Sequence, residues 1–298
     1  MMHRVHVPRS FGSTLVATLA ALCAAAPAPA GAGPDGAAAA WAYVVEIDND
    51  LLARHRLDQP GTLETVAPLI SPNQEFIGGC ETLPSSPGLL YCIESPSPPA
   101  SAAVFTVDLF DGTVTPLGLA TADPFSIFTD LATDPTTGTL YATATGISFS
   151  LLYTIDAATG DETLVGEITN VAFVTAAAFD NAGQLYVYEA DNGNLLAVDK
   201  TTGAGTVIGP TGFPSANNDA SLDFAGDGTC YYWRLDGASG SIELHTCDPA
   251  TGAATLVGAV GDVFPGGTPQ ITAAVVVELV FADGFESGDL SAWSASVP

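Results

Sequence analysis

The chain has 298 residues and carries 33 Asp and Glu against 6 Lys and Arg, a formal net charge of −27 at pH 7. This charge excludes nucleic acid and anionic membrane as expected partners, because binding to either needs clustered basic side chains. Hydrophobic residues make up 47% of the chain, so it can bury a large core and is expected to fold.

The N-terminal segment has the features of a secretory signal peptide. A short basic head precedes an apolar stretch at 11–26, and small residues follow it. Leu22 is too bulky for the position before a lipoprotein cysteine at Cys23, which favours release over lipid anchoring. We therefore predict a signal peptide and linker at 1–36, a folded domain at 37–279, and a secreted or periplasmic protein. The later apolar run at 271–282 is too short to cross a bilayer and contains Glu278, so no membrane span is predicted.

One phrase is repeated along the domain: an alternating apolar strand ending in Asp, a Gly-containing turn, and a Thr/Val-rich strand. Clear copies occupy 152–166, 195–209 and 244–258, with looser copies at 53–67 and 104–118. The marker aspartates are Asp58, Asp108, Asp156, Asp199 and Asp248. A second marker, a tyrosine, recurs in the same order as Tyr43, Tyr91, Tyr141, Tyr186 and Tyr231. Intervals of about 45 residues are typical of a repeated supersecondary unit.

Each repeat contains four short strand signals. In the fourth unit these cover 174–180, 184–190, 194–200 and 205–209, separated by Gly- and Asn-containing turns. Four antiparallel strands per repeat are typical of a β-propeller blade. We therefore predict an all-β fold, a β-propeller with five blades of four antiparallel strands.

The two ends of the domain predict how the ring closes. The first unit begins with a second strand near Trp41, whereas 270–278 has the pattern of an inner strand with no blade after it. Pairing these ends would complete the first blade and remove free edges. The expected inner strands, at 76–81, 130–134, 175–180, 219–223 and 272–278, have small residues near their middles, as a narrow axis requires.

Four cysteines of the domain fit hairpin registers. Cys230 and Cys247 lie symmetrically about the turn at 236–241, and Cys80 and Cys92 lie symmetrically about residue 86. Four cysteines allow three connectivities. Export and this symmetry favour the disulfides Cys80–Cys92 and Cys230–Cys247, with two buried pairs of free thiols as the alternative.

Stretches of the predicted blades resemble repeats of secreted bacterial propellers of the NHL and YVTN types. The similar stretches are 133–143, 179–187 and 210–233, and the likeness extends over nearly the whole domain. It consists of turn glycines, a core tyrosine and a strand-ending aspartate. The resemblance implies a propeller scaffold, often used for binding, and no particular reaction. The acidic tail at 280–298, which contains DGFESGDLSAW, is expected to be flexible and resembles short C-terminal tails of exported bacterial proteins.

Few residues indicate catalysis. We interpret His55 and His245 as strand residues, because no nucleophile turn or metal-spaced ligand accompanies either of them. The enzyme alternative is a five-bladed glycoside hydrolase, which needs two carboxylates about 5–10 Å apart. Its candidates at or near inner-strand ends and loops are Asp48, Asp130 and Asp219.

A second set of carboxylates ends the predicted inner strands: Glu81, Asp134, Asp180, Asp223 and Glu278. As a ring around the axis they would hold Ca²⁺ through oxygen ligands. The competing interpretation is that each carboxylate caps the following turn through backbone N–H groups. No other cofactor is predicted.

The loops that lead into the inner strands each contain a phenylalanine. These are Phe76, Phe125, Phe173, Phe213 and Phe264. They would fill gaps between neighbouring blades or, where exposed, surround a ligand site. The candidate ligand-binding residues are Phe125, Phe173, Phe213, Phe264, Asn217, Asn218, Asp219 and Asp262.

The sequence thus predicts an exported, non-enzymatic and monomeric propeller that binds a protein, peptide or glycan. The alternatives are a carbohydrate-active enzyme and a calcium-stabilised structural matrix protein.

Overall fold

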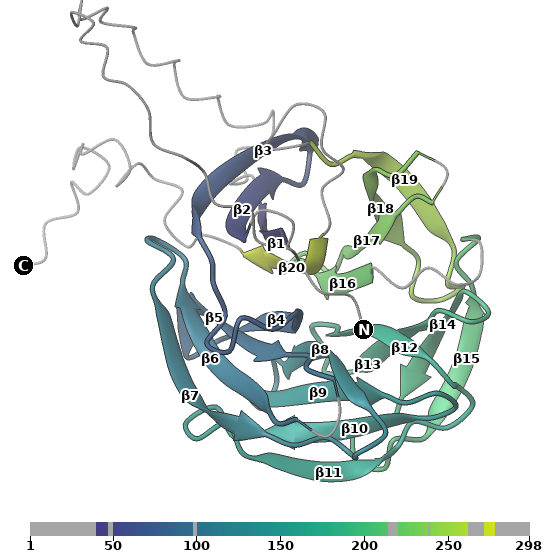
Figure 1. The fold of residues 1–298 in the computed structure, drawn as a ribbon. Helices are drawn as coiled ribbons and strands as arrows, with labels where there is room; N and C mark the ends of the chain where they lie inside the picture. Colours follow the sequence, from purple (N-terminus) through teal and green to yellow (C-terminus); the bar gives the residue numbers. More distant parts are fainter. Residues whose placement is uncertain are drawn as a thin grey trace, which may run out of the picture.

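The computed structural model describes residues 40–46, 50–97, 100–213, 220–237, 239–261 and 271–277. Within these ranges every regular element is a strand, and the strands form five antiparallel four-stranded sheets around one axis (Figure 1). The prediction of a five-bladed all-β propeller is confirmed. No helix in these ranges has the length and apolar character needed to cross a membrane.

The blades follow the chain from the inner to the outer strand. Blade 1 consists of β20 (Ile271–Val277), β1 (Trp41–Glu46), β2 (Leu51–Arg56) and β3 (Gln59–Pro68). Blade 2 consists of β4 (Ile77–Leu83), β5 (Ser86–Glu94), β6 (Ala102–Asp108) and β7 (Val114–Ala120). Blade 3 consists of β8 (Ile127–Asp134), β9 (Thr139–Thr145), β10 (Ser150–Ile155) and β11 (Glu162–Glu167). Blade 4 consists of β12 (Val174–Phe179), β13 (Leu185–Glu189), β14 (Asn194–Val198) and β15 (Gly205–Pro210). Blade 5 consists of β16 (Ala220–Phe224), β17 (Cys230–Leu235), β18 (Ile242–Cys247) and β19 (Ala254–Ala259).

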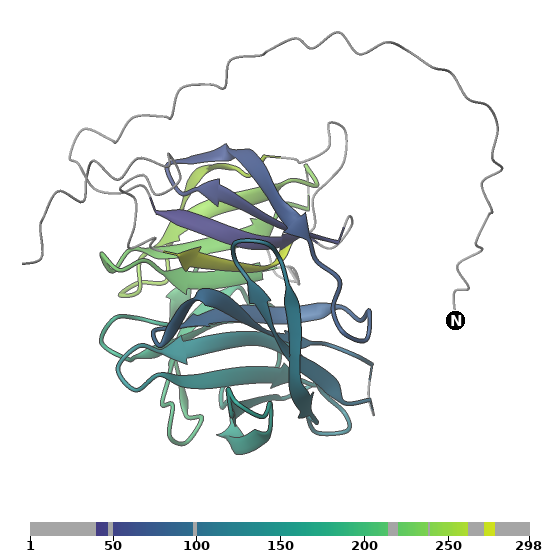
Figure 2. The same cartoon turned by 90° about the vertical axis from the view of Figure 1, so that its left-hand side faces the viewer.

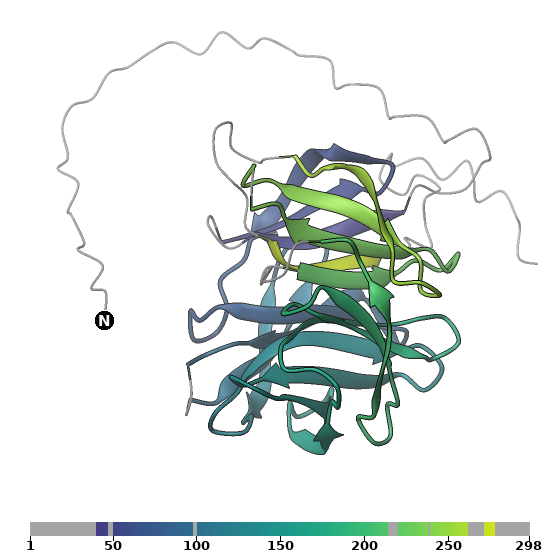
Figure 3. The same cartoon turned by 90° about the vertical axis from the view of Figure 1, so that its right-hand side faces the viewer.

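The hydrophobic core lies between the blades. The inner strands contact one another in the order β20, β4, β8, β12, β16 and back to β20. Each gap is filled from both sides, as where Val45 and Leu52 of blade 1 join one buried cluster with Phe105 and Val107 of blade 2. The side views show the sheets packed face to face around the axis (Figures 2 and 3). Each blade therefore depends on its two neighbours for burial of its apolar faces.

The predicted ring closure is confirmed. β20 pairs antiparallel with β1, with Trp41 opposite Val277 and Tyr43 opposite Val275, so blade 1 combines two distant parts of the chain. The predicted disulfides are confirmed too. Cys80 is opposite Cys92 on β4 and β5, Cys230 is opposite Cys247 on β17 and β18, and each pair forms a disulfide.

A repeated backbone contact fixes the spacing of blades 2 to 5. The turn before each outer strand presses a backbone carbonyl against a glycine in the outer strand of the preceding blade. A Cβ built on Gly166 of β11 would lie 2.5 Å from the carbonyl oxygen of Thr202 in blade 4. Thr159 approaches Gly118 and Thr251 approaches Gly209 in the same way. The pairing register shifts beside each of these glycines, which marks a β-bulge in β7, β11 and β15.

We expect Gly166→Ala to lower the free energy of unfolding by about 1–3 kcal/mol, because the added methyl group forces apart two backbones that already touch. Urea denaturation measures the change. Gly88→Ala is the matched control, since nothing lies within 4 Å of a Cβ at that position. Equal midpoints for the two variants would contradict the assignment of this contact.

Candidate binding face

The inner strands begin at one end of the ring, which we call the top face, and they end at the bottom face. Loops at the top face lead into the inner strands and also join the second strand of each blade to the third. The backbone N–H of Ser95, after β5, donates to the carbonyl of Phe76, before β4, so the two kinds of loop meet there.

The predicted phenylalanines differ in exposure. Phe125 is 76% exposed and Phe76 is 46% exposed, and both precede inner strands of neighbouring blades. Phe173 and Phe213 are partly buried against the core cluster between blades 4 and 5. The structure thus divides one sequence pattern into two roles, with exposed rings at blades 2 and 3 and gap-filling rings at blades 4 and 5. The other predicted ligand-binding residues, Phe264, Asn217, Asn218, Asp219 and Asp262, lie outside the described residues.

A local turn presents Phe125 to solvent. The carboxylate of Asp123 accepts the backbone N–H of Phe125 at 3.0 Å, and the Asp123 carbonyl accepts the N–H of Ser126 at 2.9 Å. The N–H of Asp123 in turn donates to the Tyr153 hydroxyl at 3.1 Å. An aspartate at the start of such a turn bonds the backbone two residues later, which fixes the loop without burying the side chain at its tip.

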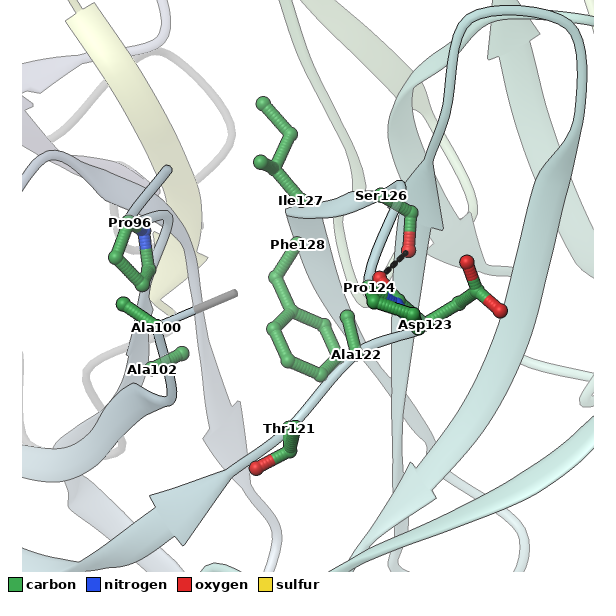
Figure 4. Close-up of a pocket in the computed structure, with 10 residues that line it drawn as sticks. All are labelled: Pro96, Ala100, Ala102, Thr121, Ala122, Asp123, Pro124, Ser126, Ile127 and Phe128. Carbon is green, nitrogen blue, oxygen red and sulfur yellow. Dashed lines mark hydrogen bonds between the residues drawn. The ribbon is translucent and has the colours of Figure 1, made fainter. Parts of the chain in front are cut away.

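Beside this turn lies a small apolar pocket between blades 2 and 3 (Figure 4). Its volume is about 80 Å³. Pro96, Ala100 and Ala102 form the wall from blade 2, and the segment 121–128 forms the wall leading into blade 3. The ring of Phe128 is 2% exposed and packs edge-on against Tyr153 at 5.6 Å between centroids, so this side of the pocket is held by the core.

Sequence reasoning missed the buried glutamate that holds the neighbouring loop. Glu94 is fully buried at the end of β5 and accepts the backbone N–H and the side-chain amide of Asn73, each at 2.8 Å. It also accepts the N–H of Ala103 at 3.1 Å. Glu189 has the corresponding place in blade 4 and binds Asn192. Both glutamates lie three residues after the marker tyrosines Tyr91 and Tyr186, which is the signal that could have revealed them.

Blades 4 and 5 contain a dense polar and aromatic group around Phe213. The ring of Phe213 stacks on Tyr232 at 4.9 Å and lies under the Arg234 guanidinium at 4.8 Å. Glu243 accepts hydrogen bonds from Arg234 and contacts His245 at 3.0 Å. Burial lowers the pKa of His245, although Glu243 opposes the shift. Since neighbouring side chains cover the ring of Phe213, this ring packs between blades. His245 lies in β18 and is the strand residue that the sequence predicts.

Besides Asp134 at the end of β8, three carboxylates lie on the inner strands: Glu81 on β4, Asp130 on β8 and Asp223 on β16. Asp130 and Asp223 are buried. Asp130 accepts the backbone N–H of Leu131 and of Ala177 on β12, at 2.9 and 2.8 Å. Asp223 accepts the N–H of Phe224 and of Val276 on β20, at 2.7 and 2.6 Å. These carboxylates join neighbouring inner strands, whose backbones do not pair with each other.

The pKa of each of these carboxyls is raised. Burial is the main cause for all three, and it raises the pKa of Asp223 to about 7. The charge of Asp223 contributes to the rise at Glu81 and at Asp130. β20 separates β4 from β16 in the ring, so the influence of Asp223 on Glu81 acts across the axis.

The set predicted to hold calcium occupies two different registers. Glu81 and Asp223 lie opposite the marker tyrosines Tyr91 and Tyr231. Tyr141 and Tyr186 instead face Ala132 and Ala178, two residues before Asp134 and Asp180. Glu278 lies outside the described residues.

Asp134 and Asp180 are bound to their own turns. Asp134 accepts hydrogen bonds from Thr136 and Lys200, which outweigh its burial and lower its pKa to about 2. Asp180 accepts the N–H groups of Ala182 and Gln184, as a turn cap does. Among the described residues no three His, Cys, Asp or Glu side chains are grouped to hold a metal ion, and the calcium site stays a prediction.

We expect the protein to lose stability as the pH rises from about 4 to about 7. Carboxyls whose pKa is higher in the folded than in the unfolded chain stabilise the fold while protonated, and this contribution is lost between the unfolded value, about 4, and the folded one. The free energy of unfolding, measured by denaturant titration, should fall by about 1–3 kcal/mol from pH 5 to pH 8.

Glu81→Gln removes one of the three charges, so it should raise the midpoint at pH 8 and flatten the pH dependence. The exposed Glu167→Gln is the control and should follow the native protein. A native midpoint that stays constant from pH 5 to 8 would contradict this account.

Comparison with known proteins yields the fold and no family. No family model and no curated protein matches the chain. Among solved structures, a chain of a nidogen/laminin complex is similar with a TM-score of 0.51 and 11% identity, covering 80% of this chain and 98% of that one. TolB from Acinetobacter baumannii is similar with a TM-score of 0.46 and 16% identity, covering 74% of this chain and 53% of TolB. A luciferin-regenerating enzyme has a TM-score of 0.45 and 14% identity, with 80% and 79% covered.

Proposed function

We propose that the protein is an exported, monomeric and non-enzymatic binding module that engages a protein, peptide or glycan through the top face of blades 2 and 3. The observation that carries this proposal is the exposed ring of Phe125, held by a hydrogen-bonded turn beside an apolar pocket. A single exposed aromatic ring is common on soluble proteins, but exposed apolar side chains that gather beside a pocket mark an interaction site.

Other exposed side chains extend this surface. Ile127 begins β8 and is 36% exposed, and Ile147 follows Gly146, whose Cβ position lies 3.0 Å from the Phe125 carbonyl. Phe76 lies before β4, next to β8 in the ring. Apolar side chains from two blades thus gather at one end of the ring, where propeller loops vary without disturbing the sheets.

Export is supported by the two disulfides and by the N-terminal signal pattern. Both disulfides join directly opposed residues within a blade, and such bonds persist in oxidising compartments. We therefore place the protein in the periplasm or outside the cell.

We propose no catalytic function. Asp130, the described candidate for a glycoside hydrolase, is buried and bound to a backbone N–H group of a neighbouring strand, and so is Asp223. These contacts hold blades together. The other candidates, Asp48 and Asp219, lie outside the described residues.

A glycan and peptide array probed with the mature protein tests the proposal. We expect Phe125→Ser to weaken the affinity for the bound ligands by about thirtyfold, since an anchoring aromatic ring typically contributes about 2 kcal/mol at an interface.

Phe110→Ser is the matched control, because Phe110 is 92% exposed but lies in the turn between β6 and β7 at the bottom face. It should bind like the native protein. Equal loss in both variants, or no bound ligand that depends on Phe125, would refute the proposed function.

A further inference from the structure

We infer that the pocket between blades 2 and 3 receives an aliphatic side chain from a basic segment of a protein partner. This inference rests on the proposed function and adds the chemistry of the partner to it. Three observations support it: the size and lining of the pocket, the contacts that hold part of that lining, and the charge of the blades around it.

The pocket fits one small apolar side chain. Its volume of about 80 Å³ is near half that of the ~150 Å³ cavity in which a protein binds benzene. It therefore holds about three or four carbon atoms, the size of a valine, isoleucine or proline side chain. Proline, alanine and phenylalanine carbons supply most of its lining, with Thr121, Asp123 and Ser126 as polar members.

Part of the pocket lining is held by the core and by a hydrogen-bonded turn. Phe128 and Ala102 belong to the core cluster of blades 2 and 3 and are 2% and 1% exposed. The turn at 123–126 is held by Asp123 and Tyr153, as described above. A preformed pocket avoids most of the entropy cost of ordering loops on binding, so a short anchor can contribute measurable affinity.

The charge of blades 2 and 3 is one-sided. Residues 69–172, which include all of blades 2 and 3, contain no Lys, Arg or His and twelve Asp and Glu. Asp123 lines the pocket, and the exposed Glu75 directly precedes Phe76.

The four basic residues of the described part belong to blades 1, 4 and 5, and each forms a salt bridge with a carboxylate: Arg54, Arg56, Lys200 and Arg234. A partner segment with Lys or Arg beside its aliphatic anchor is therefore complementary to this sector, and an acidic segment is repelled.

Labelled peptides test the inference directly by fluorescence anisotropy. The probe set consists of a Lys/Arg-flanked peptide with a central Ile, the same peptide with Gly in place of Ile, and a Glu-flanked peptide with Ile. We expect the first to bind, and we expect either change to weaken binding by about tenfold or more, which is about 1.4 kcal/mol. Binding of the basic peptide should weaken as salt is added.

Three variants test the apolar pocket and the acidic charge separately. Ala100→Trp fills the pocket from an exposed position and should weaken the Ile probe by about tenfold, while leaving the Gly probe unchanged. Asp123→Asn keeps an oxygen that accepts the Phe125 N–H but removes the charge, so it should weaken binding several-fold and reduce its salt dependence. Glu167→Gln removes an exposed charge on the outer strand of blade 3, and it should change neither the affinity for the probes nor the salt dependence of binding.

Equal binding of the basic and acidic probes, or native affinity in Ala100→Trp, overturns the inference. Array ligands that depend on Phe125 but share no basic, aliphatic pattern would also overturn it while leaving the proposed function intact. Failure of the proposed function is distinct, because then no array ligand depends on Phe125 at all.

Discussion

The contact between a turn carbonyl of one blade and a glycine of the blade before it sets the geometry of much of the ring. At Gly166 the two backbones touch, so the gap between blades 3 and 4 is fixed by atoms that have no rotamers. The gap between blades 1 and 2 uses a variant: β3 has Ala67 where the other outer strands have glycine, and the turn of blade 2 supplies Gly112 against it. The repeated glycine of the sequence is therefore explained by neighbour contact, and the bulge beside it by the need to bend the strand around that contact.

Much of the fold could be predicted from the sequence because it depends on local periodicity. Alternating strands, turn glycines and the opposed cysteines are set by neighbours along one hairpin, and the structure confirms them. The carboxylates predicted to hold calcium were grouped on the expectation that each one ends an inner strand. In the structure, β4 continues two residues past Glu81 to Leu83, and β12 ends before Asp180. The different exposures of Phe125 and Phe213 depend on how loops fold against neighbouring blades, and Glu94 is buried by a loop whose Asn73 lies 21 residues before it. Such contacts between distant residues produce no periodic pattern in the sequence.

Side chains along the axis and loops at the top face differ in how regularly they repeat from blade to blade. Along the axis, side chains such as Asp130 and Ser221 link inner strands that cannot pair through their backbones, at the expense of burying polar groups. At the top face the repeat is less regular: the turn Asp123–Ser126 leads into blade 3, and the loop held by Glu94 leads into blade 2. The most regular residues of the chain are thus those that fold it, and the departures from regularity form the surface for which we propose a partner.

The pairing of β20 with β1 also orders events during biosynthesis. β1 is made early, yet the strand that covers its free edge comes more than two hundred residues later. Until that strand is synthesised, β1 has an exposed edge, and exposed strand edges can pair with other chains. Long-range pairing of this kind is slow to form. Ring closure must therefore be a late step of folding, because it needs β20 as well as β1.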